Sequence, residues 1–117
     1  MIIGMHAIIY SRDADADRAF FRDALGFSSV DGGGGWLIFV SPPAEIALHP
    51  AELNDRHEVF LMCSNVDAEV AELAKKGIAC GPTSDEGWGR LTTIALPGGG
   101  KLGLYEPRHA LAHGGNA

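Results

Sequence analysis

The strongest constraint on the fold is a repeat, because the same order of patterns occurs twice along the 117 residues. Each half begins with a short apolar run that suits a strand, continues with a capped amphipathic helix, and ends with further strand-like runs. The same spacing separates His6 from Asp13 and Glu58 from Asn65, and the second residue of each pair suits a helix N-cap. The chain is therefore expected to fold as two similar units.

Local signals place the elements of both units. In the first half we expect a strand at 3–10, a helix from the cap at Asp13 to the stop at Gly26, a turn at 31–35 and strands at 36–40 and 45–49. In the second half we expect a strand at 58–63, a helix from the cap at Asn65 to Gly77, a loop at 81–89, a strand at 91–96, a turn at 97–100 and a strand at 101–105.

Composition narrows the classes of function. The chain has a formal net charge of −6 and no cluster of Lys or Arg, which argues against a nucleic-acid partner or an anionic membrane surface. No apolar run is long enough to span a membrane, and the N-terminus lacks the pattern of a signal peptide. Cys63 and Cys80 form no CxxC motif, and Cys63 is expected to behave as a small buried apolar residue. We therefore expect a globular cytoplasmic protein.

Four stretches carry a family resemblance. They are HAIIYSRDADADRAFFRDALGF at 6–27, SNVDAEVAELAKKGI at 64–78, WGR at 88–90 and PGGGKLGLYEP at 97–107. With the duplicated strand–helix–strands order, they resemble the vicinal oxygen chelate superfamily, which includes glyoxalase I, extradiol dioxygenases, methylmalonyl-CoA epimerase, fosfomycin-resistance enzymes and bleomycin-resistance proteins.

The resemblance implies an α+β fold in which two βαβββ modules form a cupped mixed sheet with the helices on its outer face. It gives one domain over 1–107, with modules at about 1–52 and 53–107. The tail at 108–117 is small and polar, so we expect it to be flexible, with His109 and His113 solvated. The resemblance also implies a homodimer, since family members of this length commonly pair.

In the metal enzymes of this superfamily, each module gives one ligand from its first strand and one carboxylate from its last. By this resemblance His6 falls on a ligand position and Glu58 is its counterpart, but Ala47 and Gly103 stand where the carboxylates belong. A transition metal normally needs at least three protein ligands. We therefore expect no cofactor and no resident metal. Should a divalent metal bind, His6, His49 and Glu58 would be its ligands.

Two interpretations of the His6–Glu58 pair remain open. The pair either lines the cup as a hydrogen-bonded couple without chemical work, or it contacts a bound molecule. In the second case the small residues at Ala47 and Gly103 leave room for that molecule, and apolar and aromatic side chains surround it. The expected ligand-binding residues are Ile8, Trp36, Ala47, His49, Phe60, Met62, Trp88, Gly103 and Tyr105.

Two functions follow from these interpretations. The first is a lyase, isomerase or dioxygenase-type enzyme with a degenerate metal site, in which Glu58 is the base and His6 is an acid or a metal ligand. The second is a non-catalytic protein that sequesters a small organic molecule, as bleomycin-resistance proteins do. The absent carboxylates favour the second function or an enzyme without a metal, whereas the presence of His6 and Glu58 keeps the first function open.

Overall fold

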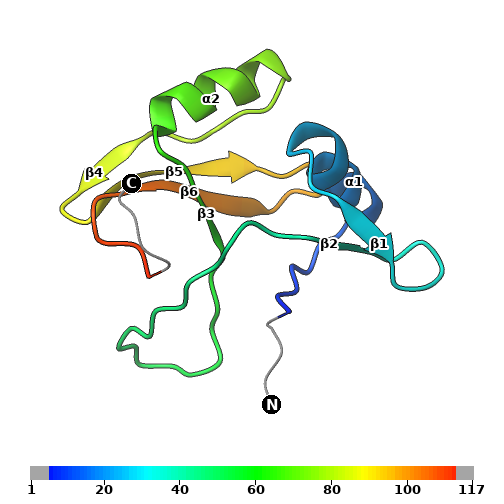
Figure 1. Ribbon diagram of the computed structural model, residues 1–117, viewed down its shortest axis with the longest axis horizontal. Coiled ribbons are helices and arrows are strands. Elements are labelled where there is room, and N and C mark those ends of the chain that lie inside the picture. Colours follow the sequence, from blue (N-terminus) through cyan, green and yellow to red (C-terminus); the bar gives the residue numbers. More distant parts are fainter. Residues whose placement is uncertain (1–5, 113–117) are drawn as a thin grey trace.

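The computed structural model describes residues 6–112, and the chain in this range folds as an α+β protein (Figure 1). The first module contains α1 (Ala14–Ala19), the π-helical turn η1 (Phe20–Ala24), β1 (Ser29–Asp31) and β2 (Leu37–Phe39). The second contains β3 (Phe60–Met62), α2 (Val66–Lys75), β4 (Ser84–Glu86), β5 (Gly89–Ala95) and β6 (Lys101–Pro107). Neither helix in this range has the length and apolar character that a membrane crossing requires.

The second module is a complete βαβββ unit. Its four strands lie in the order β3-β6-β5-β4. Strand β3 runs parallel to β6, and the other neighbours are antiparallel. In this sheet Gly103 of β6 lies between Phe60 of β3 and Thr93 of β5. Helix α2 crosses one face of the sheet, and the segment between β2 and β3 lies on the opposite side (Figure 1).

Helix α2 begins and ends where its sequence signals place it. The Asn65 side chain accepts a hydrogen bond from the Ala68 amide at 3.0 Å, and Gly77 follows the last turn with a φ of 76°. A second contact fixes the start of the helix, because the Val66 amide donates to Glu106 Oε1 of β6 at 3.0 Å. The first turn of α2 is therefore attached directly to the sheet.

The first module contains a helix and a hairpin. The Asp13 carboxylate caps α1 by accepting from the Ala16 amide at 3.1 Å, and the chain leaves η1 at Gly26 with a φ of 72°. Strands β1 and β2 form a separate two-stranded sheet. In the turn between them, the Asp31 carboxylate accepts from the amides of Gly33 at 2.7 Å and Gly35 at 3.2 Å.

Three expected strands differ from the observed ones. Residues 6–10 and 45–49 form no strand, and β3 begins at Phe60 rather than at Glu58. Residues 3–5 of the first expected strand lie outside the described residues. In the second module the corresponding strands, β3 and β6, pair with each other, whereas 6–10 and 45–49 have no strand partner in the described chain. Conversely, β4 forms inside the expected loop because it pairs with β5.

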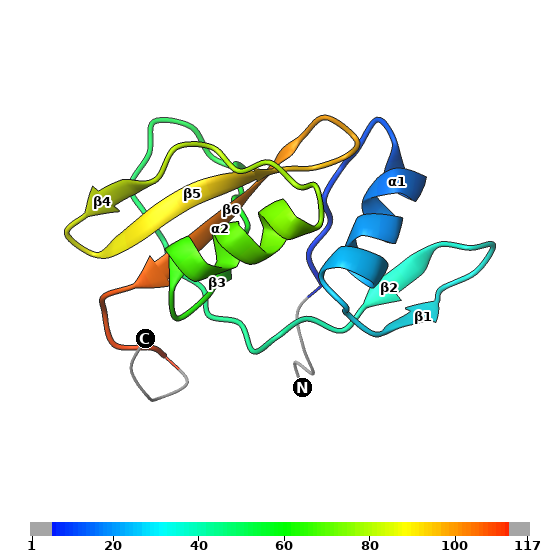
Figure 2. The same ribbon diagram turned by 90° about the horizontal axis from the view of Figure 1, so that it is seen from above.

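One core joins the two modules. Phe20 of η1 is buried among residues of the second module, which are Leu73, Ile94, Leu96, Leu102 and Leu104. Two hydrogen bonds reinforce this contact: the Gly98 amide donates to Asp17 Oδ1 at 2.7 Å, and Lys76 Nζ donates to the Ala24 carbonyl at 2.7 Å. The first-module helix therefore lies at the β5–β6 turn, beside α2 (Figure 2).

Candidate ligand-binding site

A cavity of about 460 Å³ opens on the sheet near β3 and β6. It joins residues 8–10, which precede the first helix, to residues 57–60, which precede the second. Thr93 and residues 101–103 complete its lining. The two segments that the repeat equates are therefore brought to one cavity, with Ile8 and Glu58 among its walls.

The predicted contact between His6 and Glu58 is not among the observed hydrogen bonds and ion pairs of residues 6–112. Glu58 instead accepts a hydrogen bond from Arg56 at 3.2 Å, and both side chains are largely exposed. His6 is exposed and precedes the cavity-lining segment 8–10. An exposed ion pair of this kind contributes little to stability, so the Glu58 carboxylate is free to exchange Arg56 for another partner.

Gly103 is needed for the packing of a neighbouring aromatic ring. A Cβ atom at position 103 would collide with the Phe60 ring, whose edge lies over the glycine. The sequence suggested that Gly103 leaves room for a bound molecule. In the structure the Phe60 side chain occupies that room, although it remains 39% exposed toward the cavity side. Phe60 and Gly103 both line the cavity at this point, and the aromatic ring takes up part of the room that the glycine leaves.

Aromatic side chains cluster around Tyr105 of β6. The Tyr105 ring centroid lies 5.5 Å from that of Phe60 and 5.7 Å from that of Trp88, and both rings meet it edge to face. Such geometry is favourable for aromatic pairs because a positive ring edge meets a negative ring face. Three of the expected ligand-binding residues thus form one contiguous aromatic surface beside the cavity.

The Tyr105 hydroxyl belongs to a polar cluster that the sequence did not predict. It donates to Glu45 Oε1 at 3.5 Å and lies 3.3 Å from His109 Nε2. Glu45 Oε2 accepts the Ala112 amide at 2.9 Å. Partial burial and the nearby Glu45 charge raise the pKa of Tyr105, because both disfavour the phenolate. Tyr105 therefore stays a neutral hydroxyl at physiological pH.

This cluster corrects the expectation that His109 is solvated. The His109 ring packs 6.0 Å from the Tyr105 ring, and residues 108–112 fold back toward the segment that carries Glu45. His113 lies outside the described residues. The small residues of the tail carry no local sequence signal for such a contact. Glu45 carries none either, apart from being an acidic residue beside an apolar run.

The other predicted residues are distributed between β3, the hairpin and the β2–β3 segment. Met62 lies on β3, and Ala47 and His49 are exposed on the segment between β2 and β3. Trp36 stands apart, since it packs against the Arg18 guanidinium at 5.4 Å and lines a separate open depression. Within one chain, Trp36 is therefore not a wall of the cavity beside Glu58.

The donor atoms do not fit a metal of the kind the superfamily uses. Residues 6–112 contain no group of three or more His, Cys, Asp or Glu side chains placed to hold an ion. Ala47 and Gly103, at the positions of the family's carboxylates, have no donor atom in their side chains.

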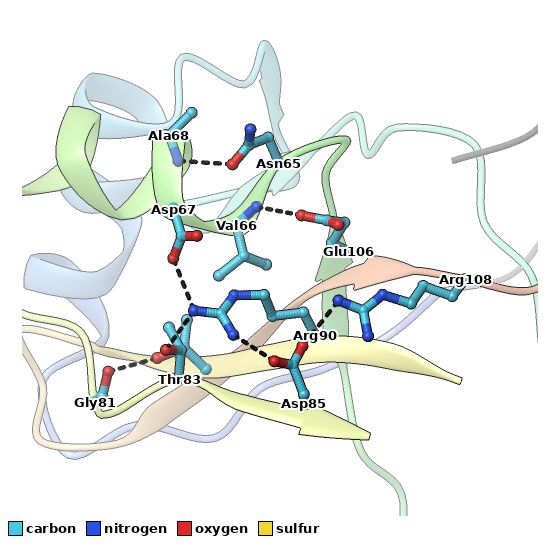
Figure 3. Close-up of polar contacts among 11 residues, drawn as sticks. Asn65, Val66, Asp67, Ala68, Gly81, Thr83, Asp85, Arg90, Glu106 and Arg108 are labelled. Carbon is cyan, nitrogen blue, oxygen red and sulfur yellow. Dashed lines mark hydrogen bonds and ion pairs between the residues drawn. The ribbon is translucent and has the colours of Figure 1, made fainter. Parts of the chain in front are cut away.

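A charged network on the helix side of the sheet holds the edge strand and α2 in place (Figure 3). Arg90 of β5 donates to Asp85 at 3.0 Å, to Asp67 at 3.1 Å and to Thr83 at 2.9 Å. Arg108 adds a bond to Asp85 at 2.8 Å, and these guanidinium groups lower the pKa of that carboxyl. Arg90 of the WGR motif thus links Asp67, in the first turn of α2, to the sheet edge.

Comparison with known proteins shows a likeness of fold. No protein-family model and no curated protein matches the chain. Among solved structures, TnmS3, an antibiotic binding protein from Streptomyces sp. CB03234, is 22% identical with a TM-score of 0.61, over 88% of this chain and 99% of that chain. The lactoylglutathione lyase from Agrobacterium tumefaciens is 16% identical with a TM-score of 0.62, over 88% and 92%.

A third match carries the superfamily name. A member of the glyoxalase/bleomycin resistance protein/dioxygenase superfamily from Sphaerobacter thermophilus DSM 20745 is 24% identical with a TM-score of 0.60, over 89% of this chain and 97% of that chain. These matches cover both modules. The chain has the fold of the glyoxalase/bleomycin resistance protein/dioxygenase superfamily, which is the vicinal oxygen chelate fold that its sequence resembles.

Proposed function

We propose that this protein binds a small, partly aromatic or apolar organic molecule in the cavity beside Glu58, and that it does so without catalysis. The observation that carries the proposal is the composition of this surface. The cavity is walled by Ile8, Phe60 and Thr93 with a single acidic side chain, and the aromatic cluster of Tyr105 continues it. Concave apolar surfaces with a few polar groups are the usual form of small-molecule sites.

The groups around the cavity indicate which chemical features a bound molecule should have. Glu58 is an acceptor whose present partner, Arg56, is exposed and replaceable. Ring faces of Phe60 and Trp88 offer stacking surface, since these side chains are 39% and 48% exposed. A flat compound with at least one hydrogen-bond donor satisfies both features. The antibiotic-binding description of TnmS3 supports a binding role, at the level of fold.

A second candidate is a metal-free enzyme in which Glu58 acts as the base. The position of Glu58 in the cavity wall favours it, because a general base must reach the proton that it removes. The binding role remains the better supported of the two. The mainly apolar lining supports it, whereas the groups of the described lining that could act as an acid beside Glu58 are His57, Tyr10 and Lys101.

The first test compares Glu58→Gln with the original chain. A panel of planar aromatic compounds is titrated while Trp fluorescence reports binding, and mass spectrometry follows each bound compound for chemical change. We expect unchanged compounds and at least about tenfold weaker binding by Glu58→Gln, because the amide lacks the charge that a donor prefers. Thermal stability should remain nearly the same, since Glu58 is exposed.

Glu69→Gln is the matched control, because Glu69 is exposed on α2, away from the cavity. It should bind as the original chain does. Chemical conversion of a bound compound that Glu58→Gln slows by about 10²–10⁴ would favour the enzyme instead. Binding that is equal in all three chains would contradict a role for Glu58.

A further inference from the structure

Three donor atoms from distant parts of the chain meet at the end of β6. The Tyr105 hydroxyl lies 3.3 Å from His109 Nε2 and 3.5 Å from Glu45 Oε1, and these last two atoms are 4.0 Å apart. We call these three side chains the polar cluster. They stand at none of the positions where the superfamily resemblance placed metal ligands, which are 6, 47, 58 and 103 in this chain. They also lie outside the lining of the cavity beside Glu58.

The His109 ring is held with one nitrogen free for the cluster. Its Nδ1 lies 2.9 Å from the Ala110 carbonyl, which can only accept, so Nδ1 carries the hydrogen of this bond. In the neutral ring Nε2 then has a lone pair and no hydrogen. A bond from one ring nitrogen to a backbone carbonyl is also what fixes the tautomer of metal-binding histidines. His109 is therefore prepared to act as an electron-pair donor.

The polar cluster contains more acceptors than hydrogens. The Glu45 carboxylate and the neutral His109 Nε2 can only accept, and the Tyr105 hydroxyl has a single hydrogen to donate to them. Within residues 6–112 no Lys or Arg side chain forms an ion pair or hydrogen bond with Glu45. Arg108, next to His109 in sequence, is bound to Asp85 instead. The cluster thus offers three electron-pair donors and has no cation to match them.

The spacing of the three atoms fits a bound ion. A single point lies about 2.1 Å from all of them, and zinc binds nitrogen and oxygen donors at about 2.0–2.2 Å. The side chains of His109 and Glu45 are 37% and 18% exposed, so water can reach a fourth position. Ca²⁺ and Mg²⁺ prefer oxygen donors and more of them, whereas an imidazole nitrogen favours transition ions.

We propose that the polar cluster binds one divalent transition ion of the size of Zn²⁺ through Tyr105, Glu45 and His109. Without an ion, the Glu45 charge helps to raise the pKa of Tyr105 and keeps its hydroxyl neutral. A bound dication reverses this effect, because its charge stabilises the phenolate. On binding, the O–H bond of Tyr105 breaks, the oxygen coordinates the ion, and the proton leaves to the solvent.

Such an ion would tie three segments together. Glu45 belongs to the β2–β3 segment, Tyr105 to β6, and His109 to the chain that follows β6. The present link between Glu45 and Tyr105 is a long hydrogen bond of 3.5 Å, which is weak. Coordination would replace it with bonds to one centre and hold residues 108–112 against the sheet. The ion touches no residue of the cavity lining, so its role is structural and independent of the proposed function.

The test measures binding of Zn²⁺ alone. The full chain is prepared without an affinity tag, treated with a chelator and dialysed against Zn²⁺, and elemental analysis gives the bound amount. We expect one ion per chain and an ultraviolet difference spectrum of one ionised tyrosine. Binding should weaken as the pH falls, because protons compete for the donors. His109→Gln and Glu45→Gln should each weaken it at least about tenfold, because each removes a direct ligand.

Glu52→Gln is the matched control, because Glu52 is an exposed acid of the same β2–β3 segment. It should bind Zn²⁺ as the original chain does. Tyr105→Phe keeps the aromatic ring, and it should bind more weakly and lose the tyrosine signal. Zn²⁺ should also slow tryptic cleavage after Arg108 several-fold in the original chain but not in His109→Gln, since only the former is closed by the ion.

Two results would overturn the proposal. The first is a chain that retains no Zn²⁺ after dialysis at micromolar concentration. The second is binding that His109→Gln and Glu45→Gln leave unchanged, and its loss in His6→Gln would then place the ion at the superfamily position. Circular dichroism checks that each variant is folded. Both Gln changes are at partly exposed side chains, so they decide the matter even if Tyr105→Phe fails to fold.

Discussion

Single residues set the character of the sheet's open face. Gly103 is small because the Phe60 ring packs over it, and Tyr105 is held between aromatic neighbours and the Glu45 carboxylate. Cys63, on the other side of the sheet, packs against the core as its sequence context predicted. Burial raises the pKa of the Cys63 thiol to about 11, which keeps it protonated and unreactive at physiological pH.

Gly103→Ala should lower stability by about 1–3 kcal/mol, because the new methyl group forces the Phe60 ring to move. Urea unfolding measures the change. Gly87→Ala is the control, since a Cβ at position 87 meets nothing within 4 Å. In the Phe60→Ala background the cost of Gly103→Ala should largely disappear, because the two positions are coupled. Equal costs in both backgrounds would show that another neighbour is responsible.

At the scale of elements, the two helices have different roles in packing. Helix α2 is anchored at its start by Asn65, Glu106 and the Arg90 network, and it covers the sheet of its own module. In the α1–η1 segment, by contrast, the buried residue Phe20 reaches into the other module. The first helix therefore links the modules more than it covers a sheet of its own.

Phe20→Ala should cost about 3–5 kcal/mol, because it removes a large buried side chain from the core that both modules share. Chemical unfolding followed by circular dichroism measures the loss. Arg22→Ala, an exposed change in the same turn, should stay within about 0.5 kcal/mol. A first module that separates from a stable second module would appear as two transitions. A small, equal effect of both changes would contradict the shared core.

At the scale of the molecule, segments distant in sequence meet on the open side of the sheet. The segment after β2 supplies Glu45, the last strand supplies Tyr105, and the chain beyond it supplies His109 and Ala112. The Arg108 amide also donates to the Trp88 carbonyl at 2.8 Å. These contacts close one end of the open face and position the aromatic cluster.

Glu45→Ala should therefore loosen the chain around residues 108–112, since it removes the acceptor for both the Ala112 amide and the Tyr105 hydroxyl. We expect trypsin to cleave after Arg108 several-fold faster, because proteolysis requires local opening. Mass spectrometry of timed digests measures the rate. Glu52→Ala, an exposed change in the same β2–β3 segment, should leave the rate unaltered. Cleavage that is equally fast in all three chains would show that Glu45 does not hold this segment.

The sequence by itself determined the features that depend on neighbours along the chain. Helix caps at Asp13 and Asn65, the stops at Gly26 and Gly77, and the glycine turns all act over a few residues, and the structure confirms them. The repeat predicted two similar units, and the sequence resembled one superfamily. The observed fold agrees with that resemblance.

Only the tertiary structure decided which extended segments become strands and which side chains meet. Residues 60–62 and 103–105 pair as parallel strands, whereas 6–10 and 45–49 have a similar apolar character but no strand partner in the described chain. Likewise, Phe60 over Gly103 and Glu45 beside His109 join residues that are distant in sequence. Backbone pairing and side-chain packing are contacts between such residues, and local patterns of polarity and turn residues do not specify them.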